Sequence, residues 1–493
     1  MAHIRFAGSS KGLRQPFVVT LFTLAACGQA AAQALSPAAL SGTLLRLPDG
    51  EVQGRADGGT RSFIGIPYAA APVGNLRWQP PQPIEAWSAT FDATGPGIAC
   101  VQPAGSGAPS VAQSEDCLRL NVFAPAEPPA QPVPVMVWLH GGGNELGSAN
   151  ALLDRPAFVG GGAPVRRYDG KAFRDFAERD VVVVTLNYRL GALGFLAHPG
   201  LTAEAGGSGN YGLLDQQAAL RWVQHNISAF GGDPDRVTLF GQEAGAIDSC
   251  YHLVAPSSRG LFHAAVLQSG TCGAERLPES PEAEARGEIT AAAIGCAALA
   301  PAESLACLRA LPAASFAQAT PASDRTLGAL AVVDGRFLRE QPAHALSAGH
   351  FEQVPLIIGN DAAQDAISCV ARQLAARASK YTAVHLYSFA RSAAWDPWPR
   401  EIDAGSGVDE LWVWNVFPAL TPYAADDVSL SLQMRGYWTR LVDGDVNIDN
   451  PRWPRPEWPR FELGSETELV IDLDITSADG LRQQRCARDA HAS

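Results

Sequence analysis

The chain has 493 residues, 47% of them hydrophobic, and a formal net charge of −13. This composition excludes a disordered chain, and the acidic balance excludes nucleic acid and anionic membrane surfaces as partners, because both need clustered Lys and Arg. No run of ~18 uncharged apolar residues follows the N-terminal region, so we expect a soluble body. The length suits two to four domains of ~100–200 residues, or one large α/β unit.

The N-terminal residues predict a secretion signal over residues 1–34. Arg5, Lys11 and Arg14 precede an apolar run at residues 17–26. A positive segment followed by a short apolar segment is typical of a signal peptide that is removed after export. We therefore expect a secreted or periplasmic protein.

Two endings of this signal remain open. Residues 24–27 resemble a bacterial lipobox, which would make Cys27 a lipidated N-terminal residue of an outer-membrane-attached lipoprotein. Residues 32–34 instead fit an A-x-A cleavage site, which would release a soluble protein after Ala34. Membrane attachment is expected only through the lipid on Cys27.

Five short apolar runs, several of them ending in glycine, are typical of central strands buried on both faces. The helical spacing of apolar residues over 211–230 predicts a helix between two of these strands. Strand–helix alternation predicts an α/β fold with a mostly parallel sheet and functional side chains at the carboxyl ends of its strands. The five expected strands are residues 133–139, 181–186, 237–240, 264–268 and 354–359.

The turn after the third strand is the first candidate for chemistry. Residues 241–245 read Gly-Gln-Glu-Ala-Gly and open a new helix. A G-x-S-x-G sequence in this context is a nucleophile elbow, a strained turn that presents one side chain to the site. Here Glu243 stands where a serine would. The pattern is uninformative alone and becomes specific through the motifs around it.

These ordered motifs resemble the type-B carboxylesterase/cholinesterase family of α/β hydrolases. The resemblance spans roughly residues 38–490 and implies an α/β-hydrolase domain over residues 35–493, with a mostly parallel central sheet and helices on both faces. The matching segments are residues 65–69, 76–78, 115–122, 140–143, 187–191, 194–195, 231–234, 241–245, 268–270, 437–439 and 444–445.

The family implies a Ser–His–acid triad, and the matching positions are substituted here. Glu243 occupies the nucleophile position. Ser406 occupies the base position, within residues 403–411. Gln364 falls at the acid position, with Asp365 one place away, and the sequence leaves open which of the two serves there.

The oxyanion hole implied by the family consists of the backbone N–H groups of Gly142, Gly143 and Ala244. Backbone donors survive side-chain substitution, so we expect the hole to be retained. One departure is Asn144, because the family usually has an aromatic residue at that position.

Serine-esterase chemistry needs a hydroxyl nucleophile and a base, so these substitutions predict an inactive family member. We hypothesise that the Glu243 carboxylate bends toward Gly142 and Gly143 and fills the hole. A weak or altered ester hydrolase with Glu243 as nucleophile is the alternative, and a decaying paralogue is a third reading. An inactive member would serve as a binding scaffold for a small ester-like or hydrophobic ligand or for a protein partner.

Neither a cofactor nor a metal is expected, because no Cys/His spacing resembles a zinc site. The family resemblance implies the disulfides Cys100–Cys117 and Cys369–Cys486. Cys296 and Cys307 are close enough in sequence to pair. Cys250 and Cys272 are left over, and for these last four residues free thiols or another pairing remain open.

The family usually has several dozen residues between the acid strand and the block that contains Cys369. Here Gly359 and Cys369 are ten residues apart. We therefore expect a helical segment that walls the family's active-site gorge to be absent, which would leave the site open or collapsed on one side.

Overall fold

A computed structural model describes the fold. It covers residues 42–104, 111–153, 164–175, 179–296, 300–319, 330–362, 365–391, 408–416, 425–448, 454–479 and 486. The chain divides into two units, Met1–Leu35 and Ser36–Ser493. The expected signal and Cys27 lie outside the described residues, so everything below concerns the second unit.

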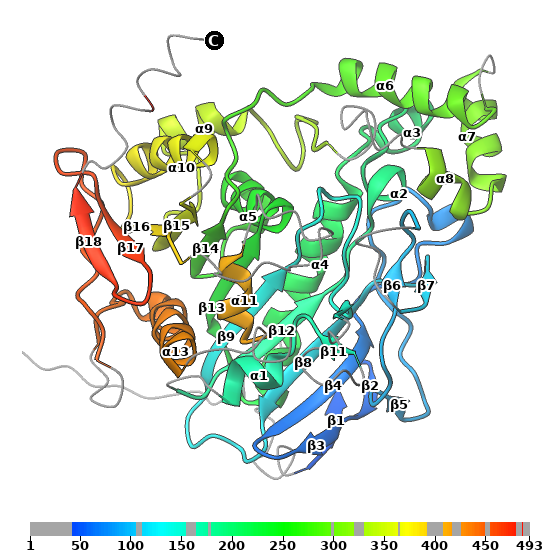
Figure 1. Ribbon diagram of the computed structural model, residues 1–493. Coiled ribbons are helices and arrows are strands. Elements are labelled where there is room, and N and C mark those ends of the chain that lie inside the picture. The colour runs from blue at the N-terminus through cyan, green and yellow to red at the C-terminus, as the bar shows by residue number, and fades with distance from the viewer. Residues whose placement is uncertain are drawn as a thin grey trace, which may run out of the picture. The chain divides into compact units, whose positions relative to one another are not determined.

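An 11-stranded sheet organises the described part of the chain (Figure 1). Its strands, from one edge to the other, are β18 (Thr476–Asp479), β17 (Thr467–Ile471), β16 (Val384–Phe389), β15 (Leu356–Asp361), β14 (Ala264–Gln268), β13 (Gly232–Gln242), β9 (Val133–Leu139), β12 (Val182–Leu186), β8 (Arg119–Pro125), β4 (Thr60–Pro67) and β3 (Arg55–Asp57). The shorter strands are β1 (Leu44–Leu47), β2 (Gly50–Gln53), β5 (Phe91–Asp92), β6 (Ala99–Cys100), β7 (Gln113–Ser114), β10 (Leu152–Leu153) and β11 (Val165–Arg166).

The centre of this sheet is parallel and its edges are antiparallel. Parallel pairing runs from β12 through β9, β13, β14, β15 and β16 to β17. Strands β8, β4 and β3 on one side and β18 on the other pair antiparallel. Strands β9, β12 and β14 are buried on both faces, which is why they appear in the sequence as mainly apolar runs.

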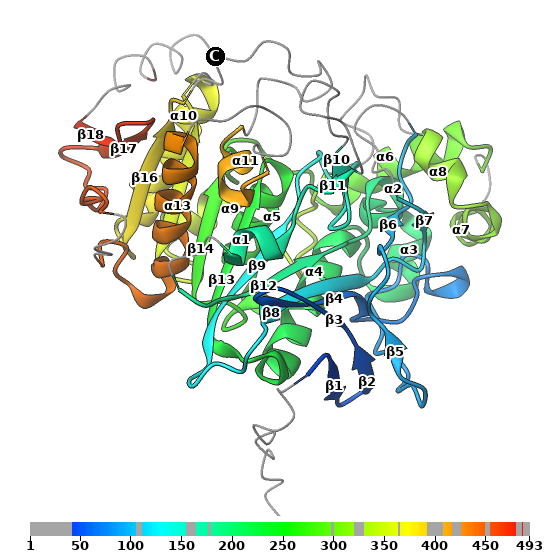
Figure 2. The same cartoon turned by 60° about the horizontal axis from the view of Figure 1, so that its bottom comes forward.

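Helices cover both faces of the sheet, as the two views in Figures 1 and 2 show. Alternate side chains of β9 point to opposite faces of the sheet. Val135 and Val137 pack in the core between the sheet and helices α4, α5, α9 and α10. Met136 and Trp138 pack in the core between the sheet and helices α1, α11 and α13. The helices are α1 (Gly170–Asp175), α2 (Gly191–Phe195), α3 (Pro199–Ala205), α4 (Tyr211–Asn226), α5 (Ala244–Val254), α6 (Ser280–Ala293), α7 (Pro301–Ala310), α8 (Ala314–Ala319), α9 (Pro342–Ala348), α10 (Asp365–Ala378), α11 (Asp409–Trp414) and α13 (Ala425–Arg440).

The α/β class and the mostly parallel sheet are confirmed. Strands β9 and β14 have the predicted bounds, and the expected helix over 211–230 is α4 followed by one short 3-10 turn, Ile227–Phe230. Strand β13 begins earlier than predicted, at Gly232, because the ladder continues past Pro234 through a bulge between Gly232 and Val237. None of the described helices is long and apolar enough to cross a membrane.

Disulfide bonds fasten several of these elements. The bonds Cys100–Cys117 and Cys369–Cys486 join the pairs that the family resemblance implies, and a third bond joins Cys296 to Cys307, which the sequence offered as one possible pairing. A fourth bond joins Cys250 to Cys272, the two residues that the sequence left open. It ties α5 to the segment that follows β14, and so braces the helix that begins directly after Glu243.

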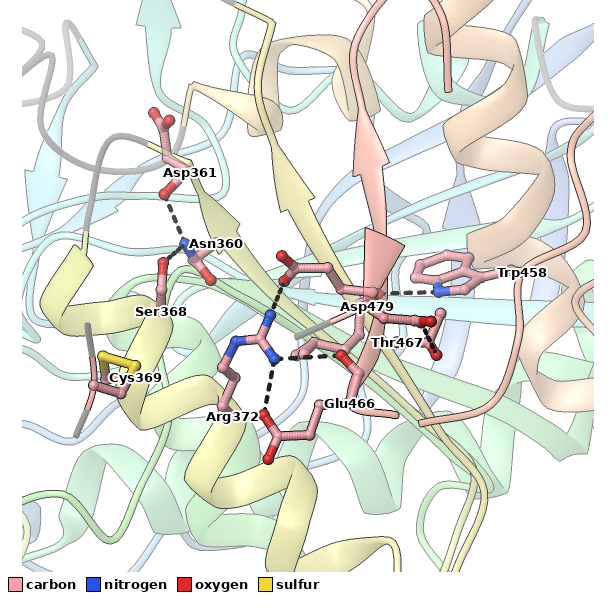
Figure 3. A network of polar contacts seen from close by, with 12 residues as sticks. Asn360, Asp361, Ser368, Cys369, Arg372, Trp458, Glu466, Thr467 and Asp479 are labelled. Carbon is pink, nitrogen blue, oxygen red and sulfur yellow. Dashed lines mark hydrogen bonds and ion pairs between the residues drawn. A yellow bond between two sulfur atoms is a disulfide. The ribbon is translucent and has the colours of Figure 1, made fainter. Parts of the chain in front are cut away.

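Polar contacts fix helix α10 to the sheet, and its Cys369 forms the disulfide bond with Cys486 (Figure 3). The Arg372 guanidinium forms ion pairs with Glu466 at 3.3 Å and with Glu468 of β17 at 2.8 Å. At the start of the helix, Asn360 Nδ2 donates to Ser368 Oγ. The short connection from β15 and these contacts together hold α10 directly after β15, the strand that precedes the expected acid position.

Candidate functional site

Glu243 connects β13 to α5 in a strained backbone conformation, with φ 53° and ψ −117°. Bonds on both sides hold the turn. Its N–H donates to the carbonyl of Gln268 at 2.9 Å, and its own carbonyl accepts from Ala246 and Ile247 at 3.1 and 3.0 Å. A non-glycine residue with this conformation persists only when its surroundings enforce it, and such residues cluster at functional sites.

Close packing explains the glycines around the turn. A Cβ on Gly245 would lie 2.0 Å from the carbonyl oxygen of Leu139 in β9, and one on Gly241 would lie 2.4 Å from Gly245. A Cβ on Gly270 would lie 2.3 Å from the Glu243 carbonyl oxygen. The glycine spacing is therefore required by the approach of strand and helix, whatever residue stands between them.

The loop after β9 supplies backbone donors opposite this turn. Gly142, Gly143 and Asn144 all have positive φ, of 114°, 64° and 59°. At the start of the loop, the hydroxyl of Tyr188 donates to the His140 carbonyl at 2.7 Å and so anchors it. This conformation turns successive N–H groups toward the elbow.

The Glu243 carboxylate lies in the position expected for an oxyanion. Its Oε2 accepts from the N–H of Gly142 at 2.7 Å and from the N–H of Gly143 at 3.0 Å. Hydrogen bonds to an ionised acceptor are about twice as strong as neutral ones. Ala244, the third expected donor, begins α5, and among the described residues its N–H forms no bond to this carboxylate.

A buried polar cluster lies behind the loop. Asn144 Nδ2 donates to Asp248 Oδ1 at 3.0 Å, and Gln216 Nε2 donates to Asp248 Oδ2 at 2.6 Å. Asp248 belongs to α5 and is fully buried. The pKa of its carboxyl is raised to about 7: burial and, to a smaller extent, the charge of Glu243 raise it, while the bonds from Gln216 and Asn144 lower it.

A second buried cluster lies on the other side of the elbow, at α11. Gln268, whose carbonyl receives the Glu243 N–H, donates through Nε2 to Asp409 Oδ2 at 3.1 Å. Tyr387 also donates to this carboxylate. Burial raises the pKa of Asp409 to about 6. The next residue, Glu410, pairs with Arg167 at 2.6 Å, so the segment that follows the Ser406 position is fixed to the site by charge as well as by packing.

Two expected triad positions cannot be placed. Gln364 and Ser406 lie outside the described residues, and the backbone of Asp365 begins α10 while its side chain is outside that part. His140, which directly follows β9, and His385 of β16 are buried, and burial lowers the pKa of both side chains to about 4. Within the described residues no group of three or more His, Cys, Asp or Glu side chains is arranged to hold a metal ion.

Sequence reasoning missed Asp248, Asp409 and the Arg167–Glu410 pair. A signal for the first was present, since Asp248 is a charged residue in the otherwise apolar and small-residue stretch of α5. Acidic side chains are almost never fully buried without partners, so this one predicted a specific hydrogen-bond donor. Asn144 was singled out as a departure from the family, but its partner could not be named.

Comparison with known sequences identifies the family to which the chain belongs. The sequence model of the carboxylesterase family matches residues 41–371, which include the elbow and the loop after β9. The chain belongs to the carboxylesterase family. The match ends within α10, so the assignment of Ser406 rests on its motif in the sequence alone.

Individual relatives of this carboxylesterase-family chain are esterases. It is 41% identical over 317 residues to a fumonisin B1 esterase of Sphingopyxis macrogoltabida, which covers 64% of this chain and 54% of that protein. It is 39% identical over 314 residues to a cocaine esterase of Oryctolagus cuniculus, covering 62% and 54%. It is 46% identical over 225 residues to a para-nitrobenzyl esterase of Bacillus subtilis, covering 45% and 42%. The chain thus spans about half the length of these relatives.

Proposed function

We propose that this carboxylesterase-family chain does not hydrolyse esters through a serine and that Glu243 keeps its oxyanion hole filled. The observation that carries the proposal is the pair of bonds from Gly142 and Gly143 to Glu243 Oε2, at 2.7 and 3.0 Å. The donors that would stabilise a tetrahedral intermediate are engaged by a side chain of the protein itself.

The chemistry supports this proposal. A carboxylate in the hole repels the anionic oxygen of a tetrahedral intermediate, and no hydroxyl is present at the elbow to form one. Loss of a triad nucleophile alone lowers turnover by ~10⁴–10⁶, and further losses then add little. The reading of Ser406 at the base position points the same way.

We infer that the retained fold serves binding. The ligand would be a small ester-like or hydrophobic molecule, or a protein partner, at the mouth of the site near Gly142 and Gly143. The N-terminal pattern supports export to the periplasm or beyond, with attachment to a membrane only if Cys27 is lipidated. Four disulfides among the described cysteines are compatible with an oxidising compartment.

Labelling with a fluorophosphonate probe tests the inactivity. We expect the wild-type protein and the Glu243→Gln variant to remain unlabelled, and p-nitrophenyl ester hydrolysis to stay at the buffer rate. Glu243→Ser alone should remain nearly silent because Ser406 stands at the family's base position, while Glu243→Ser combined with Ser406→His should gain labelling. Glu303→Ser, a change at an exposed residue of α7, controls for a new serine elsewhere. Labelling of the wild-type protein would refute the proposal.

A second candidate function, an altered hydrolase, is favoured by one detail. Both described bonds engage Oε2. Oε1 could then attack an alkyl halide or epoxide carbon, displacing the leaving group with its electron pair and forming an ester of Glu243. Water must then cleave this ester, which requires a base. Turnover in ¹⁸O-water would place ¹⁸O in the peptide that contains Glu243, and Glu243→Gln would abolish both label and turnover.

A further inference from the structure

The cluster behind the oxyanion loop is part of a longer buried chain of hydrogen bonds. Gln217 Nε2 donates to Ser258 Oγ at 2.8 Å, and Ser258 Oγ lies 2.9 Å from His252 Nδ1. His252 Nε2 lies 3.0 Å from Gln216 Oε1. Gln216 then donates to Asp248, which also accepts from Asn144.

The direction of this chain follows from its two ends. When Asp248 is ionised it can only accept, and the Gln216 amide then presents Nε2 to it and Oε1 to the histidine. His252 therefore donates through Nε2 and accepts at Nδ1 from the Ser258 hydroxyl. Burial lowers the pKa of His252 to about 3, which fits a neutral ring with one donor. Every donor in this series of hydrogen bonds points toward Asp248, and hydrogen bonds aligned in this way strengthen one another.

Asn144 connects this chain to the oxyanion loop. It directly follows Gly143 and has φ 59°, while its carbonyl accepts from the Gly191 N–H at 2.7 Å. Asp248 stands five residues after Glu243, ~7.5 Å along the axis of α5. The carboxylate that fills the hole therefore directly precedes α5, and the carboxylate that accepts from the loop lies within that helix.

We propose that Asn144 and Asp248 are positioning residues: their hydrogen bond clamps the oxyanion loop to α5 and so fixes the distance between the Gly142 and Gly143 N–H groups and the Glu243 side chain. The inference deepens the proposed function, because it concerns the same hole, but it requires only that the loop be held by this bond.

The electrostatic setting supports a dedicated role. Asp248 is fully buried, lies within reach of the charge of Glu243, and is faced by the buried hydroxyl-bearing rings of Tyr188 and Tyr251, whose pKa values it helps to raise. A buried charge in such a place is unfavourable unless specific donors compensate it. The two donors that do so come from Gln216 and from the loop itself.

The clamp is tested by amide hydrogen exchange of the peptide covering residues 139–148. We expect Asn144→Ala to accelerate exchange of this peptide at least tenfold, because the loop loses its side-chain tie while the bond from Gly191 remains. The matched control is Asn226→Ala. Asn226 has the same 6% exposure as Asn144 and a single donor bond, from Nδ2 to the Trp222 carbonyl at 2.9 Å, at the far end of α4.

A double-mutant comparison guards against a general loss of folding. Asp248→Ala should accelerate loop exchange as Asn144→Ala does, and the double variant should be no faster than either single one. Asp248→Asn, which keeps the volume and one acceptor, should be intermediate. Unchanged exchange in Asn144→Ala, or the same acceleration in Asn226→Ala, would overturn the clamp.

A separate readout distinguishes the clamp from the occupancy of the hole. Glu243→Ala empties the hole, so acetate should bind there. The melting temperature of this variant should then be higher in sodium acetate than in sodium chloride of equal ionic strength. Adding Asn144→Ala should weaken acetate binding at least tenfold, and adding Asn226→Ala should leave it unchanged. Acetate that fails to bind Glu243→Ala, with loop exchange still dependent on Asn144, would refute the proposed function and uphold the clamp.

Discussion

Replacing Asp248 by asparagine should make the protein more stable at neutral and alkaline pH. Burial raises the pKa of this carboxyl from 3.8 to about 7. In the unfolded chain the group is solvated and ionises near its ordinary value. Between about pH 4 and pH 7 the folded chain therefore holds a proton that the unfolded chain has released.

The sign of the pH dependence follows from this proton. Because the folded state binds more protons, the free energy of unfolding decreases as pH rises through this window. The decrease amounts to ~4 kcal/mol, since each pH unit of difference corresponds to about 1.4 kcal/mol. Below about pH 4 both states are protonated and the penalty vanishes, and above about pH 7 it is complete and constant.

Asparagine cannot ionise and so removes this dependence. It can still accept from Gln216, and Asn144 can turn its amide, because its Oδ1 has no hydrogen-bond partner among the described residues. The difference in unfolding free energy between Asp248→Asn and the wild type should thus grow by ~4 kcal/mol in favour of the variant between about pH 4 and pH 8.

Urea denaturation followed by tryptophan fluorescence, at half-unit pH intervals with disulfides intact, measures this difference. A control of opposite sign is Asp443→Asn. Although burial raises the pKa of Asp443, its bonds from Arg179 and Arg236 lower it overall, so this variant should lose stability relative to wild type as pH rises. A difference for Asp248→Asn that stays constant within ~0.5 kcal/mol would refute the reasoning, because changes of that size are common for surface substitutions.

Two further predictions concern the scaffold of the site. Gly245→Ala should lower the free energy of unfolding by more than ~4 kcal/mol or abolish soluble expression, since the new methyl group would meet a β9 carbonyl oxygen at 2.0 Å. The control Gly464→Ala should change the free energy of unfolding little, because no described atom lies within 4 Å of the added methyl group. Removing Cys369–Cys486, which spans 117 residues, should cost about 5 kcal/mol in urea denaturation, and removing Cys296–Cys307, which spans 11, about 3 kcal/mol. Equal losses would contradict the dependence on loop length.

The central strands could be predicted because their signals are local. A strand such as β9 is buried on both faces, so seven consecutive positions carry apolar residues and Gly141 marks its end. The start of β13 was missed, because Asp233 and Pro234 resemble a turn in sequence. The ladder to β9 continues past them through a bulge that only the neighbouring strand defines.

In the site, too, local features could be predicted from the sequence and contacts between distant residues could not. The glycines of the elbow and of the loop after β9 lie within a few residues of one another, and their spacing encodes the backbone. The bond between Asn144 and Asp248 joins residues 104 positions apart, so neither spacing nor periodicity reveals it. Each residue alone was unusual for its place, an amide where the family has a ring and an acid in an apolar helix, and only the fold brings the two together.

The same distinction explains why the glycines of the elbow do not depend on the residue at position 243. Gly241, Gly245 and Gly270 are required by contacts of 2.0–2.4 Å between backbone segments, and these contacts exist whether residue 243 is a serine or a glutamate. The donors of Gly142 and Gly143 likewise belong to the backbone. Close packing alone therefore requires the glycines of the elbow. Once a carboxylate stands at the elbow, the hole binds it with charge-assisted hydrogen bonds. In this family the glycine pattern reports the fold, and the chemistry must be judged from the side chains at the elbow and at the base.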